Sequence, residues 1–293
     1  MTNEYKIEHF PSLSLNHVHI KDKAAVIQKI NQILCDGSNK LQVVTDFDFT
    51  LTKQHINGTR TLSSFALFSK CKHLPRTYPE EDKRLQRKYR PIEVNPDLPL
   101  DVKIAAMEQW MYDTENLIKG VELKAEELND VIETNKAVLR DGTIQLFDKL
   151  NSLSVPILVF SGGLGDVVEA VLTHHNILLK NVKVISNFLK FNNSIIEGFK
   201  NSILIHAFNK NEHSLESSYL KNLKDRRNVI LMGDTTGDVH MADGLDDAQT
   251  ILRIGFLYDD VELCLEAYKN IYDIVLVDDQ TMQVTLEILQ PIL

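Results

Sequence analysis

The sequence has few cysteines and no long apolar run. Its 293 residues include three cysteines, which are far apart and form no CxxC pair: Cys35, Cys71 and Cys264. This pattern is typical of reduced thiols and indicates neither a disulfide framework nor a cysteine-based metal site. No apolar run reaches the ~18 residues that a membrane span requires, and residues 1–20 lack the basic-then-apolar pattern of a secretion signal. We therefore expect a cytoplasmic protein that does not bind membranes.

The sequence also lacks an excess of basic residues. It has 32 Lys and Arg against 41 Asp and Glu, which gives a formal net charge of −9. Proteins that bind nucleic-acid polymers need a clustered basic surface, so we expect no such partner. Hydrophobic residues make up 43% of the chain and charged residues 25%, which is typical of a globular protein with a sizeable core. We expect a monomer.

Short apolar runs take the place of a long one. Four of them read as strands, at residues 41–48, 155–163, 228–238 and 272–277. The second and third end in polar or Gly-rich turns that lead into helical patterns. Fully apolar strands that alternate with helices predict a parallel sheet covered on both faces. We therefore expect an α/β fold with a Rossmann-like parallel sheet as its core.

The stretch from residue 54 to residue 135 has a different pattern of charged and apolar residues. It contains charged helical patterns, among them "PEEDKRLQRKYR" and "PLDVKIAAMEQWMYDTENLIKG", and no convincing strand. Because it follows the first strand, we expect a helical cap domain over the strand ends. The α/β core then consists of residues 1–53 and 136–293.

Two carboxylates stand one residue apart at the end of the first strand, in "VVTDFDFTLT". Residues i and i+2 of a strand share one face, so Asp46 and Asp48 should lie close together and repel. Magnesium resolves this repulsion, because it prefers hard oxygen ligands and accompanies phosphates. One aspartate could then act as nucleophile and the other as proton donor and acceptor. The alternatives are a solvated turn and the DxD metal site of nucleotide-sugar glycosyltransferases.

Three further motifs follow at or after other apolar strands. "GDTTGD" brings Asp234 and Asp238 to a strand end, and four carboxylates together would need a cation; Asp238 could alternatively cap the helical pattern at 238–245. "FSGG" supplies the Ser161 hydroxyl and the backbone amide of Gly162, a combination suited to phosphate oxygens. Lys210 by itself is typical of a surface residue. Because ligands bind beyond the carboxyl ends of parallel strands, these motifs could converge on one site.

The order DxDxT, Ser, Lys, GDxxxD resembles that of the haloacid dehalogenase superfamily of phosphotransferases. Four segments are similar in sequence to the class III cytosolic 5′-nucleotidases: "VVTDFDFTLT", "VFSGG", "FNKNE" and "LMGDTTGDVHMADG". The similarity extends over nearly the whole chain. The resemblance implies that Asp46 attacks phosphorus and becomes an aspartyl phosphate. It implies that Asp48 protonates the leaving ribose oxygen and then deprotonates the water that hydrolyses the intermediate.

The resemblance also implies the ligands of the cofactor and of the phosphate. Mg²⁺ would be held by the Asp46 side chain, the Asp48 backbone carbonyl and Asp234, with Asp238 supporting through water. The phosphoryl oxygens would be bound by Ser161, Gly162 and Lys210.

The same family leaves two substrate classes, pyrimidine monophosphates such as CMP and 7-methylguanosine monophosphate. A methylated guanine is cationic and favours aromatic faces and a carboxylate acceptor. Candidates in the expected cap are Phe68, Glu93, Trp110, Thr114 and Glu115. The resemblance implies that the position of Glu93 contacts the base and that Thr114 stands where the family has Ser. Phe65, Phe68 and Trp110 could instead be packed cap core.

The leading hypothesis is therefore a Mg²⁺-dependent 5′-nucleotidase that acts on nucleoside monophosphates of these two classes. A DxD glycosyltransferase would leave "GDTTGD" and Lys210 unexplained. A catalytically inactive nucleotide-binding module on the same scaffold is the other alternative, and the presence of both Asp46 and Asp48 argues against it.

Overall fold

A computed structural model describes residues 4–95, 97–135, 137–210, 223, 225–243, 245 and 248–293. Three parts of the sequence named above lie partly or wholly outside these ranges. They are the last two residues of "FNKNE", the end of the helical pattern predicted at 238–245, and residue 136, where the second core segment was predicted to begin.

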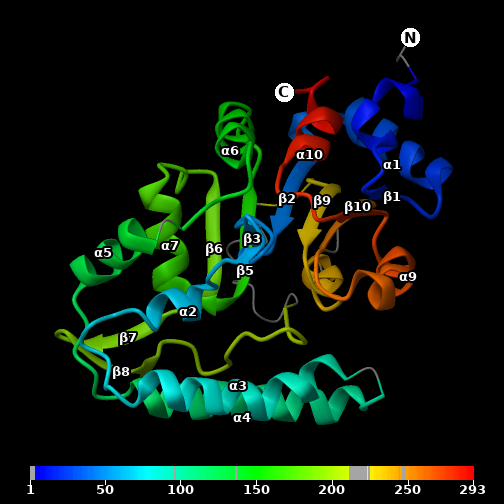
Figure 1. The fold of residues 1–293 in the computed structure, drawn as a ribbon. Coiled ribbons are helices and arrows are strands. Elements are labelled where there is room, and N and C mark those ends of the chain that lie inside the picture. The colour runs from blue at the N-terminus through cyan, green and yellow to red at the C-terminus, as the bar shows by residue number, and fades with distance from the viewer. Residues whose placement is uncertain are drawn as a thin grey trace.

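A mostly parallel sheet forms the centre of the molecule (Figure 1). Within the described residues it has seven strands, in the order β1 (Val18–His19), β11 (Ile274–Val277), β10 (Thr250–Leu257), β9 (Asn228–Gly233), β2 (Leu41–Thr45), β5 (Ile157–Leu164) and β6 (Val182–Asn187). All four predicted strands are present, and their pairing is parallel. The predicted α/β fold is thus confirmed, with one addition: the short edge strand β1 pairs antiparallel to β11.

Helices cover both faces of this sheet, which explains why its central strands are mostly apolar. One face packs against α1 (Lys23–Asp36), α6 (Thr143–Ser152), α7 (Gly165–His174) and α10 (Gln283–Leu289). The other face packs against α9 (Val261–Ile271) and the 3₁₀ helix η5 (Asp238–Ala242). Successive residues of β2 alternate between the two clusters, since Val43 belongs to the first and Val44 to the second.

The stretch after β2 contains a small hairpin and four helices. The helices are α2 (Ser64–Phe68), α3 (Tyr78–Val94), α4 (Leu100–Ile118) and α5 (Ala125–Asn135). The hairpin, β3 (His55–Ile56) and β4 (Thr59–Arg60), was not expected. Its turn places Asn57 and Gly58 at φ 51° and 77°, and an Asn-Gly pair is a hairpin signal that the sequence did contain.

The helices α3 and α4 lie side by side beyond the carboxyl ends of β2 and β9, at the opposite end of the molecule from both termini (Figure 1). Their packing is local, with Leu85, Tyr89 and Met107 buried between them. By contrast, α2 and α5 pack against α7. A second hairpin, β7 (Leu189–Asn192) and β8 (Ile195–Phe199), adjoins α4.

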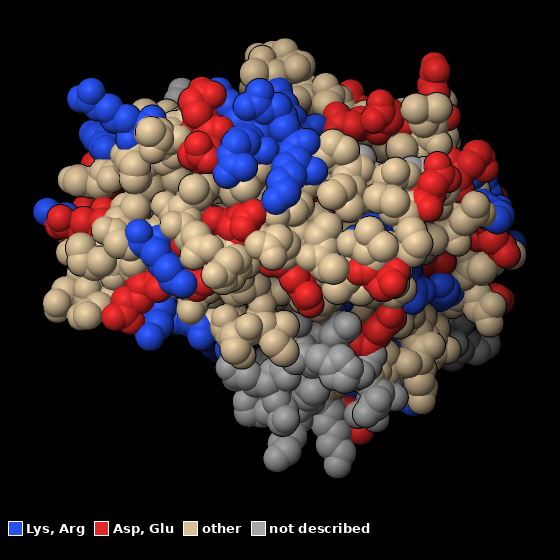
Figure 2. Space-filling view, turned by 90° about the horizontal axis from the view of Figure 1, so that it is seen from below, with Lys and Arg blue, Asp and Glu red and all other residues tan. Residues whose placement is uncertain are grey.

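The face seen from below carries charges of both signs (Figure 2). The largest group of Lys and Arg side chains lies near the upper centre of this face, smaller groups lie toward its left and right sides, and Asp and Glu side chains are spread between them. In the described ranges, no helix has the length and apolar character that crossing a membrane requires.

Candidate active site

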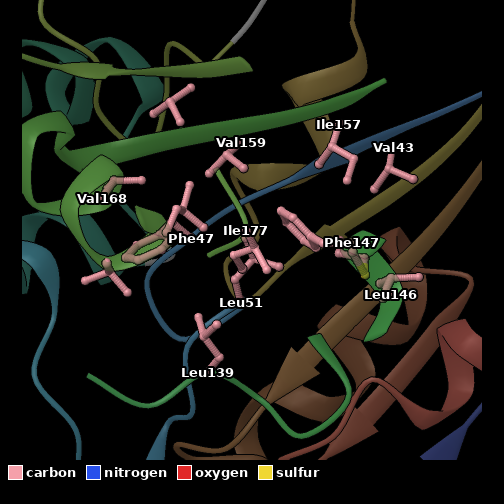
Figure 3. Close-up of a cluster of buried hydrophobic side chains, with 14 of the residues drawn as sticks. Val43, Phe47, Leu51, Leu139, Leu146, Phe147, Ile157, Val159, Val168 and Ile177 are labelled. Carbon is pink, nitrogen blue, oxygen red and sulfur yellow. The ribbon is translucent and has the colours of Figure 1, made fainter. Parts of the chain in front are cut away.

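The loop after β2 aims its aspartates away from the core because Phe47 is anchored within it. Phe47 is fully buried and lies with Leu51 among side chains of β5 and α7 (Figure 3). Its carbonyl oxygen accepts hydrogen bonds from the backbone N–H groups of Thr50, Leu51 and Thr52, at 3.3, 3.0 and 3.1 Å. Asp46 continues the strand pairing, since its N–H donates to the Met232 carbonyl of β9 at 2.9 Å. A rigid turn therefore begins at the nucleophile expected from the sequence.

A buried arginine fixes the next part of this loop. Phe49 has φ 63°, a left-handed conformation that costs a non-glycine residue of order 1–3 kcal/mol and needs support from its surroundings. Arg140 supplies that support, because its guanidinium donates to the carbonyl oxygens of Phe49 and Thr50, each at 2.6 Å. The same group lies 3.9 Å from the centre of the Phe256 ring, and burial lowers its pKa to about 10. Nothing in the sequence around Arg140 pointed to this role.

Three of the predicted carboxylates meet in one cluster. Asp46, Asp234 and Asp238 each bring an oxygen within 4.8 Å of the others. The Lys210 ammonium bonds Asp46 and, at 2.8 Å, Asp238. Residues from three distant parts of the chain thus converge, as the position of the motifs at strand ends predicted.

Asp238 has a different role from the helix cap considered above. Its Oδ2 accepts hydrogen bonds from the backbone N–H groups of Asp234 and Thr235 and from the Thr235 hydroxyl, at 3.2, 2.9 and 2.8 Å. The cap position of η5 is Gly237. A Cβ at Gly233 would lie 2.4 Å from the Asp238 Cβ, so the first glycine of "GDTTGD" is needed for this close approach. Asp238 therefore closes the turn that presents Asp234.

The electrostatics of the cluster fit a divalent cation. Burial raises the pKa of Asp46 to about 7, against the lowering effect of Lys210, and raises the pKa of Asp234 well above its ordinary value. Burial alone would lower the pKa of Lys210, but Asp238 and Asp46 together raise it. Among the described residues of this cluster, the buried carboxylates of Asp46 and Asp238 and the half-buried one of Asp234 face the Lys210 ammonium, so negative charge exceeds positive charge. Carboxylate oxygens are hard ligands of the kind that Mg²⁺ prefers.

The carboxylate of Asp48 lies outside this cluster and is held by α2. Its Oδ1 accepts from the Ser64 backbone N–H at 2.8 Å and its Oδ2 accepts from the Ser64 hydroxyl at 2.6 Å. Burial raises the pKa of Asp48, and the two hydrogen bonds oppose that rise. Both oxygens of this half-buried carboxylate therefore bond α2, which differs from the solvated turn considered above. The role of Ser64 was not predicted. The one sequence signal for it is a pair of serines, Ser63 and Ser64, at the start of a helical pattern.

The residues predicted to bind phosphate line the same cavity, which has a volume of about 870 Å³. Ser161 is buried, and its hydroxyl oxygen accepts from the Gly163 N–H at 3.0 Å. The Gly162 carbonyl accepts from the Asn187 side chain at 2.9 Å. Asp46, Asp48, Lys210 and Asp234 also line this cavity.

The opposite wall of the cavity comes from α3 and α4. Of the predicted base-binding residues, Glu93, Trp110 and Thr114 line it, together with Phe65 of α2. Trp110 is half-buried and stacks on Tyr89, with ring centroids 5.7 Å apart and planes at 16°. The Glu93 carboxylate is paired with Arg90.

Two predicted base-binding residues lie elsewhere. Phe68 has 1% exposure and packs edge-on against Tyr78 at a centroid distance of 5.9 Å. Glu115 accepts from the Phe199 N–H of β8 at 2.9 Å and pairs with Lys119 at 3.1 Å. Phe68 is therefore core, and Glu115 joins α4 to the hairpin. The alternative that these phenylalanines are packed core therefore holds for Phe68, whereas Phe65 lines the cavity.

Comparisons with known proteins agree with this geometry. The family model described as "Pyrimidine 5′-nucleotidase (UMPH-1)" matches residues 49–293. A 7-methylguanosine phosphate-specific 5′-nucleotidase of Drosophila melanogaster is 40% identical over 95% of this chain and 88% of its own length. The enzyme of the same description from Homo sapiens is 37% identical over 88% of this chain and 86% of its own length.

A solved structure shows the same fold. Cytosolic 5′-nucleotidase IIIB bound to cytidine superimposes with a TM-score of 0.94 at 39% identity, covering 98% of this chain and 97% of the other. A probable phosphoserine phosphatase of Vibrio cholerae, at 14% identity and a TM-score of 0.51, shares the fold alone. Because the 5′-nucleotidases match along almost the whole length, the chain belongs to the pyrimidine 5′-nucleotidase (UMPH-1) family, a family of 5′-nucleotidases.

Proposed function

We propose that this 5′-nucleotidase hydrolyses 7-methylguanosine monophosphate and pyrimidine monophosphates such as CMP to nucleoside and phosphate. The observation that carries the proposal is a single cavity with two unlike ends. One end has the carboxylate cluster and Lys210, which suit a phosphate, and the other has the indole of Trp110, which suits a base. The names of the relatives, and the cytidine in the structure of nucleotidase IIIB, support these two substrate classes.

In the proposed reaction, an Asp46 oxygen attacks phosphorus while the bond to the ribose 5′ oxygen breaks. Asp48 gives its proton to that oxygen, then takes a proton from the water that hydrolyses the aspartyl phosphate. Mg²⁺, held by Asp46, the Asp48 carbonyl and Asp234 with Asp238 in support, would offset the charge of the phosphate. Ser161, Gly162 and Lys210 would hold the phosphoryl oxygens.

At the other end, the base would stack on the Trp110 face that Tyr89 does not cover. Glu93 and Thr114 would then bind its polar edge. We propose that residues 54–135 act as a cap over the phosphate site. The arrangement of α3 and α4 beyond the strand ends supports this division. A relative named as a putative cytosolic 5′-nucleotidase supports a cytoplasmic location, and we propose that the enzyme acts there as a monomer.

The proposal is tested by phosphate release from a panel of nucleoside monophosphates in Mg²⁺. We expect the highest kcat/KM for 7-methylguanosine monophosphate and CMP. Equal kcat/KM for GMP and its 7-methyl derivative would contradict recognition of a cationic base. Absence of phosphate release from every member would contradict the proposed reaction itself.

Trp110→Ala should lower kcat/KM for 7-methylguanosine monophosphate by roughly 10–100-fold, and it should lower kcat/KM for CMP clearly less. A cationic base gains about 0.5–2 kcal/mol on an indole face beyond apolar contact, which is about 2–30-fold at ~1.4 kcal/mol per factor of ten. The loss of the apolar contact itself, which also affects CMP, accounts for the rest. The loss should appear mainly in KM, because the stacking is alike in the ground state and the transition state.

Trp110→Leu and Trp110→Phe are the matched controls. Leucine keeps apolar packing on Tyr89 without an aromatic face, so its substrate selectivity should follow the alanine variant. Phenylalanine keeps a weaker aromatic face and should be intermediate. If all three variants melt at much lower temperature and lose both substrates equally, Trp110 only packs the α3–α4 pair.

A further inference from the structure

We propose that Ser64 is a positioning residue that orients the Asp48 carboxyl group for proton transfer to the leaving oxygen. The proposal rests on the role proposed above for Asp48. Ser64 itself is fully buried and opens α2, whereas Asp48 belongs to the loop after β2. One residue thus bonds both oxygens of the carboxylate, through its backbone N–H and its hydroxyl.

The Ser64 hydroxyl makes a further contact that holds it in place. Its Oγ accepts a hydrogen bond from the Leu164 N–H at 3.1 Å. An ionised carboxylate only accepts hydrogen bonds, so the hydroxyl donates to Asp48 Oδ2, 2.6 Å away. Each carboxyl oxygen has a second lone pair, so Ser64 fixes the plane of the group and leaves a position on it for the proton that moves.

The glycine of the phosphate loop makes room for this arrangement. A Cβ at Gly163 would lie 2.0 Å from the Ser64 Oγ and 2.9 Å from Asp48 Oδ2. The Ser64 hydroxyl therefore fills the space between the end of β5 and the carboxyl group of Asp48. The next residue, Phe65, lines the cavity, but a change in the Ser64 hydroxyl does not alter its ring.

Ser64 acts in the first chemical step, the transfer of the phosphoryl group to Asp46. The Asp46 oxygen forms a bond to phosphorus, the bond from phosphorus to the 5′ oxygen breaks, and the proton of Asp48 moves to that oxygen. Positioned proton donors of this kind contribute about 10²–10⁴-fold to rate. A leaving thiolate needs no such proton, since a thiol has a pKa of about 8.5.

Ser64→Ala should therefore lower kcat/KM for CMP by about 10–100-fold, with the loss in kcat and KM unchanged. The backbone N–H remains, so Asp48 keeps one of its two bonds. The two substrates are compared by single-turnover release of the nucleoside, because the later hydrolysis of the aspartyl phosphate is the same for both and also uses Asp48. On the analogue of CMP with sulfur as the bridging 5′ atom, the same variant should lose less than about threefold in this release, well under the ~1.4 kcal/mol of a tenfold change. Ser64→Cys, whose thiol is a weak donor, should fall between serine and alanine on CMP.

Two controls separate this effect from a fault in folding. Ser69→Ala removes a hydroxyl from the other end of α2, where it donates to the Ala66 carbonyl at 2.7 Å, and should leave kcat unchanged. Ser64→Ala added to Asp48→Asn should cause no further loss on CMP, because Ser64 acts through Asp48.

Equal losses on the oxygen and sulfur substrates for Ser64→Ala, or a further loss in the double variant, would overturn the proposal. The Asp48→Asn variant identifies which proposal has failed. If it too loses equally on both substrates, Asp48 is not the proton donor. If only Ser64→Ala loses equally, Asp48 is the donor and Ser64 merely packs.

Discussion

Asp46→Asn should fold normally and lose nearly all phosphatase activity, with kcat lower by at least about 1,000-fold. A carboxamide oxygen is too weak a nucleophile to attack phosphorus, and removal of a catalytic nucleophile costs several orders of magnitude. Phosphate-monoester hydrolysis is among the slowest uncatalysed reactions, so little background rate would mask the loss. The measurement is phosphate release from CMP and 7-methylguanosine monophosphate.

The fold of this variant should survive because Asp46 is one of three clustered carboxylates. Its replacement removes like-charge repulsion, and Lys210 keeps Asp238 as a partner. Asp243→Asn is the matched control, because that carboxylate is exposed and pairs with His240 beyond the cluster. It should retain full activity. If Asp46→Asn kept a tenth of the wild-type kcat, Asp46 would not be the nucleophile.

Chelation should abolish turnover, and added Mg²⁺ should restore it. The carboxylates of Asp46, Asp234 and Asp238 lie together, and the Lys210 ammonium bonds those of Asp46 and Asp238. They cannot approach a phosphate dianion unless a cation offsets their charge. We expect at least a ~100-fold fall in kcat/KM in excess chelator, because electrostatic stabilisation is commonly the largest catalytic contribution. Full activity under these conditions would contradict the metal assignment.

Metal binding should also be visible without substrate. A cation that binds only the folded chain raises the melting temperature, and Asp234→Asn should weaken that rise. Calcium should inhibit, because it tolerates more ligands and looser geometry and would misplace the nucleophile. Exposed Asp243→Asn again provides the comparison, since it should leave the Mg²⁺-dependent rise unchanged.

The sequence predicted the parts of this protein that depend on local pattern. Apolar strands followed by Gly-rich turns predict a parallel sheet, and parallel strands bring their carboxyl ends to one edge. Asp46, Ser161 and Asp234 were therefore expected together from the sequence. The strands β6 and β10 were not predicted, because polar residues such as Lys183 and Arg253 interrupt their apolar runs. Hydrogen bonding to neighbouring strands stabilises these segments, and the sequence pattern does not show it.

The end of the cavity that we propose for the base was harder to predict, because its lining depends on which face of a helix is covered. Phe65 and Phe68 have the same chemistry and lie one turn apart, yet Tyr78 covers Phe68 while Phe65 reaches the cavity. Glu115 likewise differs from Glu93 only in its neighbours, since the β8 backbone occupies its carboxylate. Spacing along the chain contains no information about these partners.

The sequence by itself predicted four strands of the parallel sheet, the helical character of the stretch after the first strand and the four motifs of the candidate phosphate site. Their chemistry is local: residue type and position relative to a strand end are enough. Only the tertiary structure decided what holds the site in shape. Arg140 supports the loop after Asp48, and Ser64 holds the Asp48 carboxyl group. Each lies in a different segment from the group it fixes, and such pairings arise only when packing brings distant segments together.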